Sequence, residues 1–142
     1  TKATEAHQLQ KIKETIRLIK DFVSLEKQKT LYVSSFDQNT LMTIHQQAPH
    51  LQLILNCKKE TTPQDILCYH KNMPYLKGIC LNIDILTQAN IAKAQGLNWL
   101  TAVYTCNHDD ELRKALAVKI DIIITDYPKK SKAKIRQIIN KS

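Results

Sequence analysis

Glycine and aromatic residues are both scarce in this chain. Two glycines and four prolines occur among 142 residues, which excludes repetitive glycine-rich or proline-rich proteins. Aromatic residues make up 6% of the chain and do not interleave with the lysine-rich stretches, as a surface that stacks nucleic-acid bases requires. No apolar run approaches the ~20 residues that cross a bilayer. We therefore expect neither a nucleic-acid partner nor a membrane span.

The four cysteines also lack the sequence spacing that is typical of a metal site. The chain has four of them and no Cys-x-x-Cys pair, so the spacing does not indicate a zinc site. Three fall in or beside predicted strands, where cysteine behaves as a small hydrophobic residue. We interpret all four as reduced thiols of the core: Cys57, Cys68, Cys80 and Cys106.

Positive charge is what the chain has in excess, with a net charge of +8. Most of it lies in the first predicted helix and in the tail after Pro128. We interpret these stretches as solvated helix faces, with a field that attracts phosphate as the alternative. The chain begins at Thr1 without an initiator methionine or an apolar signal core, so we expect a removed leader or a start inside a longer chain. The predicted location is the cytoplasm.

Five short apolar runs alternate with helical patterns along the chain. Apolar residues from Leu9 to Val23 recur at helical spacing, and Thr62-Pro63 and Thr87 are start signals of later helices. Asp109 or Asp110 is the expected cap of another. The runs that we predict as strands are Leu31–Phe36, Leu51–Asn56, Gly78–Leu81, Trp99–Cys106 and Ile120–Thr125.

Strands that are apolar throughout and alternate with helices are typical of parallel sheets covered by helices. The predicted class is α/β. Two architectures agree with this pattern: a doubly wound five-stranded sheet of flavodoxin type and a segment of an eight-fold barrel. Periodicity alone leaves both open.

Three local strings choose between the two architectures. They are Ser34-Ser35-Phe36-Asp37, Tyr104-Thr105-Cys106-Asn107 and the segment 121–128, Asp-Ile-Ile-Ile-Thr-Asp-Tyr-Pro. Together with Ala48-Pro49, and in this order, they resemble the glycerophosphodiester phosphodiesterase family. The resemblance implies a partial TIM-type (β/α) barrel of about five parallel strands, with residues 1–142 as the C-terminal portion of the domain. Lys119, Ile122 and Asn98 stand where that family usually has glycine.

The family's catalytic motifs do not occur in this sequence. By resemblance they are a His-Arg-Gly, a Glu-Asn, a Glu-Phe-Asp, a His-Asp and a Glu-Ile-Lys, which supply two acid–base histidines and the carboxylates that hold a divalent cation such as calcium or magnesium. The resemblance implies a hydrolase that converts a glycerophosphodiester to glycerol phosphate and an alcohol. We therefore expect no catalytic residue, no metal ligand and no cofactor in this chain, and no activity from the chain alone.

The residues that the resemblance places toward the substrate lie at strand ends. Core packing for Tyr104, and turn or strand-end hydrogen bonding for the others, are the alternatives. We interpret Asp126 as a structural cap and the cluster His108-Asp109-Asp110 as helix capping rather than a metal site. The candidate substrate-binding residues are Ser35, Phe36, Asn82, Tyr104 and Asn107.

Three hypotheses about function remain open at this point. The first is a piece or truncated relative of a phosphodiesterase, and the second is a non-catalytic relative that binds glycerol phosphate. The third is an unrelated five-stranded signalling or nucleotide-binding module. Under the first two, the edge strands Leu31–Phe36 and Ile120–Thr125 invite self-association or pairing with an N-terminal barrel half.

Overall fold

The structure is a computed structural model that describes residues 2–141. Helices and strands alternate along this part of the chain. Two compact units are present among the described residues, the first formed by residues 2–56 with Tyr75–Lys77 and the second by Cys57–Pro74 with residues 78–141. The strands are β1 (Tyr32–Ser35), β2 (Gln52–Cys57), β3 (Gly78–Asn82), β4 (Leu100–Tyr104) and β5 (Ile122–Ile123).

The five strands follow one another in the sheet in the order β1-β2-β3-β4-β5. The pairs β1–β2, β3–β4 and β4–β5 are parallel, and their helical crossovers are those of a (β/α) barrel. A doubly wound sheet would reverse direction in its strand order. The predicted α/β class and partial TIM-type architecture are therefore confirmed, and the flavodoxin alternative is wrong.

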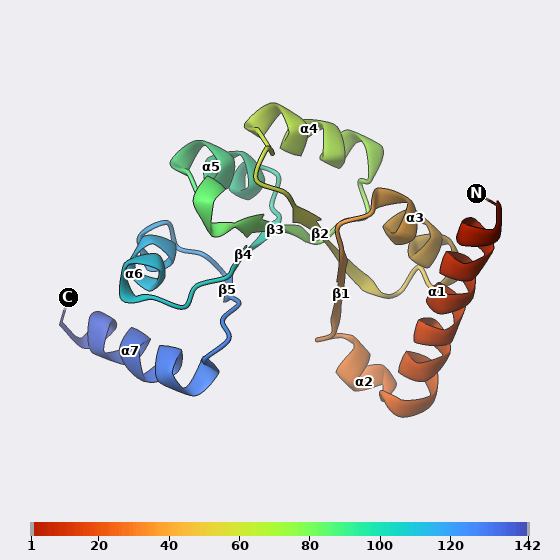
Figure 1. Cartoon of the computed structure of the whole chain (residues 1–142), viewed down its shortest axis with the longest axis horizontal. Helices are drawn as coiled ribbons and strands as arrows, with labels where there is room; N and C mark the ends of the chain where they lie inside the picture. Colours follow the sequence, from red (N-terminus) through yellow and green to blue (C-terminus); the bar gives the residue numbers. More distant parts are fainter. Residues whose placement is uncertain (1, 142) are drawn as a thin grey trace. The chain divides into compact units, whose positions relative to one another are not determined.

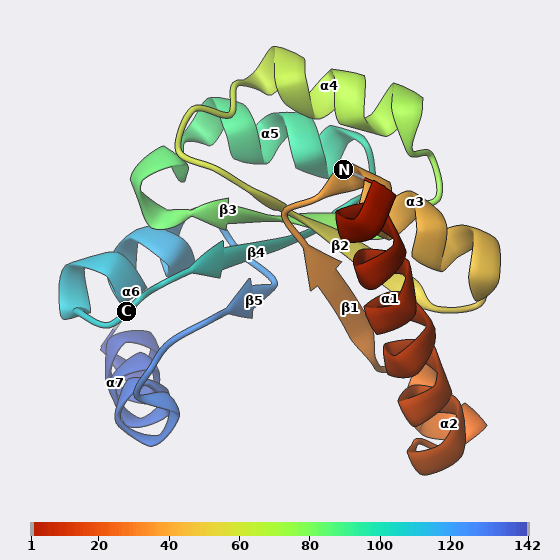
Figure 2. The same ribbon diagram turned by 45° about the vertical axis from the view of Figure 1, so that its right-hand side comes forward.

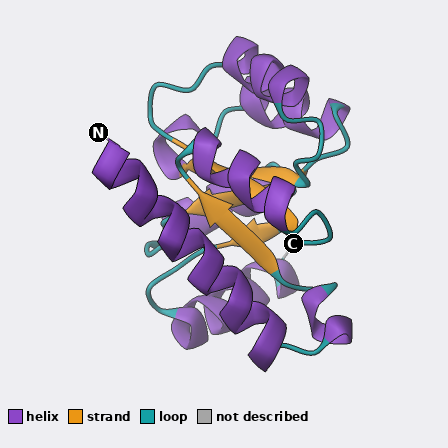
Figure 3. Cartoon of the chain, turned by 90° about the vertical axis from the view of Figure 1, so that its right-hand side faces the viewer, coloured by secondary structure: helices purple, strands orange, loops and turns teal. Residues whose placement is uncertain are grey.

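The first unit contains α1 (Lys2–Phe22), α2 (Leu25–Gln28), β1, α3 (Gln38–Gln47) and most of β2. The long α1 packs against α3 (Figure 3), and Ile12 of α1 is buried. The sequence pattern predicted α1 but missed α2. The available signal was Ser24, whose side-chain oxygen accepts a hydrogen bond from the Lys27 backbone N–H as a helix cap.

The second unit contains α4 (Pro63–Asn72), β3, the 3₁₀ turn η1 (Ile83–Ile85), α5 (Gln88–Gly96), β4, α6 (Asp109–Ala117), β5 and α7 (Pro128–Asn140). Helices α4 and α5 run side by side (Figure 2), and α7 packs against α6 (Figure 1). Strand β3 is buried except at its last residue, and the three central residues of β4 are buried. Burial on both faces explains why these strands are continuous apolar runs in the sequence.

Strand β5 is shorter than the apolar run 120–125 predicted. Only Ile122 and Ile123 are in the ladder, and both are half-buried. Asp121 fixes the start of the strand, because its carboxylate accepts hydrogen bonds from the N–H and the hydroxyl of the buried Thr101, at 2.9 and 3.1 Å. The Asp121 N–H in turn donates to the Thr101 carbonyl at 2.9 Å.

The helix starts confirm two of the predicted caps and correct one. Thr62 and Asp65 form a reciprocal capping box at the start of α4, and the Thr87 side chain accepts from the Asn90 N–H at the start of α5. The expected cap of α6 by Asp109 or Asp110 is wrong. His108 is the N-cap, and its backbone N–H donates to Glu111 at 3.0 Å. A glutamate three residues after the cap is the capping-box position, so the sequence did carry the signal.

Two helices end in left-handed residues that are not glycine. Asn98 follows α5 with φ 58° and Lys119 follows α6 with φ 56°. After α6, Ile120 N–H donates to Ala115 O and Lys119 N–H donates to Leu116 O. This pair of bonds is a Schellman motif, in which the left-handed position is usually glycine. The same pattern closes α5, so the backbone does require positive φ at both glycine-like positions.

We expect Lys119→Gly to stabilise the protein by about 1 kcal/mol, because a residue with a Cβ in the left-handed region costs ~1–2 kcal/mol. The measurement is the free energy of unfolding from urea titrations. Lys119→Ala should give no such gain, since alanine keeps the Cβ. Asn98→Gly should give a smaller gain, because asparagine tolerates this conformation. Equal gains from the glycine and alanine variants at 119 would assign the effect to charge instead.

The cysteines divide into two groups. Cys57, Cys80 and Cys106 are buried thiols, as predicted. Cys68 is also a thiol but lies exposed on α4, so its assignment to the core is wrong. The amphipathic α4 turns one face to solvent, and Cys68 lies two residues after the fully buried Ile66. In residues 2–141, no helix is both long enough and apolar enough to cross a membrane.

Candidate functional site

Tyr104 is the last residue of β4 and is half-buried. Its hydroxyl donates a hydrogen bond to the carbonyl oxygen of Cys57 at 2.8 Å. Burial raises the pKa of Tyr104, and a hydrogen bond with Asn82 acts in the opposite direction. The ring is thus held in place at its polar end while part of it stays exposed to solvent.

Asn82 ends β3, the strand that pairs with β4, and Tyr104 is its register partner. Its side-chain oxygen accepts from the Asp84 N–H at 2.9 Å and so caps η1. The Asp84 carboxylate forms an exposed ion pair with Lys59 at 3.1 Å. The structure therefore brings Asn82 and Tyr104 together at the carboxyl ends of two neighbouring strands.

Asn107 connects the end of β4 to the segment after β5. Its amide group donates to the Asp126 carboxylate at 2.8 Å, and its oxygen accepts from the Asp126 N–H at 2.9 Å and the Thr125 hydroxyl at 3.1 Å. The Thr125 hydroxyl also contacts that of Ser131 at 3.0 Å, which ties the network to α7. Asp126 therefore has a structural partner, although it binds Asn107 rather than capping a helix. Sequence reasoning had left out Thr125 and Ser131.

Ser35 and Phe36 belong to the first unit, at the carboxyl end of β1. The Ser35 hydroxyl accepts from the Asp37 N–H at 3.0 Å, and Asp37 caps α3. Phe36 is 50% exposed, one of several large apolar side chains of the described residues that are partly open to solvent. Ser35 therefore has the turn role that was the alternative to substrate binding, because its hydroxyl oxygen already accepts a hydrogen bond from the backbone.

The cluster 108–110 has no metal-site geometry. Asp109 pairs with Lys134 of α7 at 2.9 Å, and this hydrogen bond lowers the pKa of the Asp109 carboxyl, with the lysine charge adding to the effect. Between residues 2 and 141 no three His, Cys, Asp or Glu side chains are grouped so that they could hold a metal ion. The carboxylates at the strand ends of the second unit have partners of their own, Asp84 with Lys59 and Asp126 with Asn107.

Polar and aromatic groups at the carboxyl ends of parallel strands are typical of the binding face of a (β/α)-barrel enzyme. Residues 1–130 match the model of the glycerophosphoryl diester phosphodiesterase family. The chain belongs to this family, as the strings at Ser34, Tyr104 and Asp121 predicted. No curated protein sequence matches it significantly.

Solved structures show the same fold. An Oleispira antarctica phosphodiesterase in complex with the product sn-glycerol-3-phosphate is 15% identical, with a TM-score of 0.80 over 93% of this chain and 51% of that one. A glycerophosphodiester phosphodiesterase from Parabacteroides distasonis is 13% identical, with a TM-score of 0.75 over 94% and 53%. A Silicibacter pomeroyi protein assigned to the same activity is 18% identical, with a TM-score of 0.79 over 96% and 46%. The chain spans about half the length of these proteins.

Proposed function

We propose that this chain is the C-terminal portion of a glycerophosphodiester phosphodiesterase domain, whose reaction converts a glycerophosphodiester to glycerol phosphate and an alcohol. The observation that carries the proposal is the family match over residues 1–130. The sequential parallel strand order and the bound sn-glycerol-3-phosphate of the Oleispira antarctica relative support it.

The role that we assign to this chain is binding of the glycerol or alcohol portion of the substrate. The residues proposed for it in the second unit are Asn82, Tyr104 and Asn107, and Ser35 and Phe36 are separate candidates in the first unit. Support comes from Asn82 and Tyr104, which lie together at adjacent strand ends, and from the half-exposed Phe36 ring. Amide groups and an aromatic face suit a small polyol, since they offer hydrogen bonds and an apolar wall.

The divalent cation of the full family domain does not fit the donor set of residues 2–141. Calcium takes six to eight oxygen ligands, and magnesium requires an octahedral set. In this part of the chain the acidic groups at the strand ends are separated and paired with lysine or asparagine.

We expect the chain alone not to hydrolyse glycerophosphodiesters, even with added calcium or magnesium, because the acid–base histidines and metal ligands are absent. The measurement is a coupled assay for glycerol phosphate released from glycerophosphocholine. Without acid–base catalysis and without a bound cation, most of the very large rate enhancement of phosphate-ester hydrolysis should be lost. Turnover that copurifies with the chain and disappears in His108→Ala would contradict this expectation.

A non-catalytic binding protein is the second candidate, and the positive net charge favours it. Calorimetry with sn-glycerol-3-phosphate separates the candidates, since binding without turnover supports this one. Asn82→Ala should weaken binding, whereas Asn140→Ala, at the exposed end of α7, should not. Equal binding by both variants would place the ligand elsewhere.

We expect the chain to self-associate or to pair with an N-terminal barrel half, because β1 and β5 are the edges of the sheet and unpaired edges bind other strands. Sedimentation velocity at several protein concentrations tests self-association. Ile124→Lys, next to β5 and 45% exposed, should reduce it, whereas Ile139→Lys on α7, 56% exposed, should not. A monomer at every concentration, with no complex on adding an N-terminal half, would contradict the proposal.

A further inference from the structure

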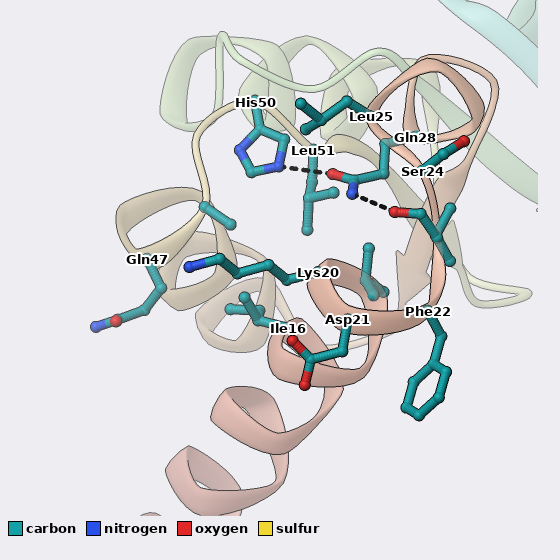
Figure 4. Close-up of a pocket in the computed structure, with 13 residues that line it drawn as sticks. Ile16, Lys20, Asp21, Phe22, Ser24, Leu25, Gln28, Gln47, His50 and Leu51 are labelled. Atoms are coloured by element: carbon teal, nitrogen blue, oxygen red, sulfur yellow. Dashed lines mark hydrogen bonds between the residues drawn. The ribbon is translucent and has the colours of Figure 1, made fainter.

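A cavity of about 760 Å³ lies in the first unit, where the end of α1, α2 and the segment between α3 and β2 meet (Figure 4). Its volume is within the ~300–1,000 Å³ range of small-molecule sites. Most of the wall is apolar, with Ile16, Ile19 and Val23 on one side and Leu51 on the other. The cavity is next to the amino end of β2, which begins at Gln52, whereas Ser35 and Phe36 lie at the carboxyl end of β1. It is therefore separate from these residues of the proposed substrate site.

One buried polar side chain fixes the wall of this cavity. Gln28 is 5% exposed, and its amide nitrogen donates to the Val23 carbonyl at 2.8 Å. The amide oxygen consequently faces His50, whose Nε2 is 2.9 Å away (Figure 4). Because the glutamine oxygen only accepts, His50 Nε2 carries the hydrogen of this bond. The pair ties α2 to the segment before β2 and so fixes this part of the cavity wall.

The charges at the cavity favour a ligand with a single negative charge. Lys20 lines the cavity and is exposed to solvent, and no carboxylate in the described part of the chain is within ion-pair distance of it. Asp21 also lines the cavity, but its carboxylate binds Arg17 at 3.1 Å. One available cation beside a paired aspartate suits a carboxylate better than a phosphate monoester, which carries about −1.5 to −2 charges and favours several donors.

We propose that this cavity is a binding site for a medium- or long-chain fatty acid. The hydrocarbon chain lies against Ile16, Ile19, Val23 and Leu51, and the carboxylate is held at the surface by Lys20. Apolar burial supplies most of the affinity, while the lysine selects the anionic head group. This ligand and its site are independent of the proposed phosphodiesterase function, because the residues that carry them belong to a different place in the fold.

Calorimetry with octanoate, decanoate and dodecanoate, each below its micelle concentration, tests the apolar part of the proposal. Affinity should rise about fourfold for each added methylene until the cavity is filled. Ile16→Trp should weaken saturable binding by obstructing the apolar wall of the cavity, and Ile19→Trp provides the same test if the first variant fails to fold. Absence of binding at all three chain lengths, or unchanged binding in a folded tryptophan variant, would overturn the site.

Head-group selectivity is tested with dodecan-1-ol and with a matched pair of lysine variants. Lys20→Met should weaken dodecanoate binding about threefold to fivefold and leave dodecan-1-ol unaffected. Lys13→Met, which removes an exposed charge of α1 away from the cavity, should change neither. If dodecan-1-ol binds the wild-type chain as tightly as dodecanoate, the assignment to a fatty acid is wrong. Binding of sn-glycerol-3-phosphate, measured separately, reports on the strand-end residues and not on this cavity.

Discussion

Gly78→Ala is expected to destabilise the second unit by about 3 kcal/mol or more, or to prevent its folding. Gly78 begins β3 and is paired in register with Leu100 of β4. A Cβ at this position would be 2.1 Å from the Leu100 carbonyl oxygen and 2.8 Å from its carbonyl carbon. Both are backbone atoms of the neighbouring strand, so no side-chain rotation can relieve the contact. Only a shift of β3 relative to β4 could.

The other glycine of the chain is the matched control. Gly96 ends α5, its φ is not left-handed, and a Cβ added there would meet no atom of another element of residues 2–141 within 4 Å. Gly96→Ala should therefore stabilise the protein by about 0.5–1 kcal/mol. Urea unfolding followed by the fluorescence of Trp99, the single tryptophan and 6% exposed, measures both variants. A Gly78→Ala protein as stable as wild type would contradict the close approach of β3 and β4 at this position.

Alkaline pH is expected to destabilise the fold by several kcal/mol through the buried thiols. Burial raises the pKa of Cys57 and Cys80 from 9.0 to about 12, and that of Cys106 to about 11. In the unfolded chain these thiols lose their protons near pH 9, whereas the folded chain retains them. The stabilisation is fully present below about pH 9 and is lost as pH rises toward the folded pKa values. From about pH 9 to about pH 11, Cys57 and Cys80 together should cost about 4 kcal/mol.

The measurement is the free energy of unfolding in urea at a series of pH values. Burial also raises the pKa of Tyr69 and Tyr75, so tyrosines add a loss of the same sign above about pH 10. The slope of the free energy of unfolding against pH must therefore be compared between variants. Cys57→Ala should reduce the dependence on pH, while Cys68→Ala, at the exposed thiol, should leave it unchanged. An identical slope in both variants would rule out the buried thiols as its cause.

The fold was largely predictable from the sequence because its signals are local. Continuous apolar runs predicted the strands, and Thr62-Pro63 and Thr87 predicted two helix starts. The length of β5 was overestimated, since composition shows that Ile120–Thr125 is apolar but not that the regular strand is limited to Ile122 and Ile123. Periodicity alone could not predict the strand order. The three strings at Ser34, Tyr104 and Asp121 predicted it through their resemblance to a barrel family.

The strand-end locations of Asn82 and Tyr104 were predictable from the sequence, but their contacts were not. Strand-end residues such as Asn82 and Asn107 follow from the order of motifs along the chain. The hydrogen-bond partners of the strand-end residues could not be predicted. The Tyr104 hydroxyl binds a carbonyl 47 residues earlier in the chain, and Asn107, after β4, binds Asp126, after β5. Contacts of this kind depend on tertiary structure that no local pattern encodes. The fatty-acid cavity had no sequence signal for the same reason.

The single exposed cysteine, Cys68, is the one thiol of the described residues that reagents in solution can reach. Thiol reagents act on the thiolate, and the raised pKa and burial of the three core cysteines keep them protonated and out of reach. A maleimide fluorophore or spin label should therefore attach at Cys68 alone, on the solvent side of α4, without any engineered substitution. Oxidation would follow the same selectivity, with Cys68 as the position where two chains become covalently linked in the absence of reductant.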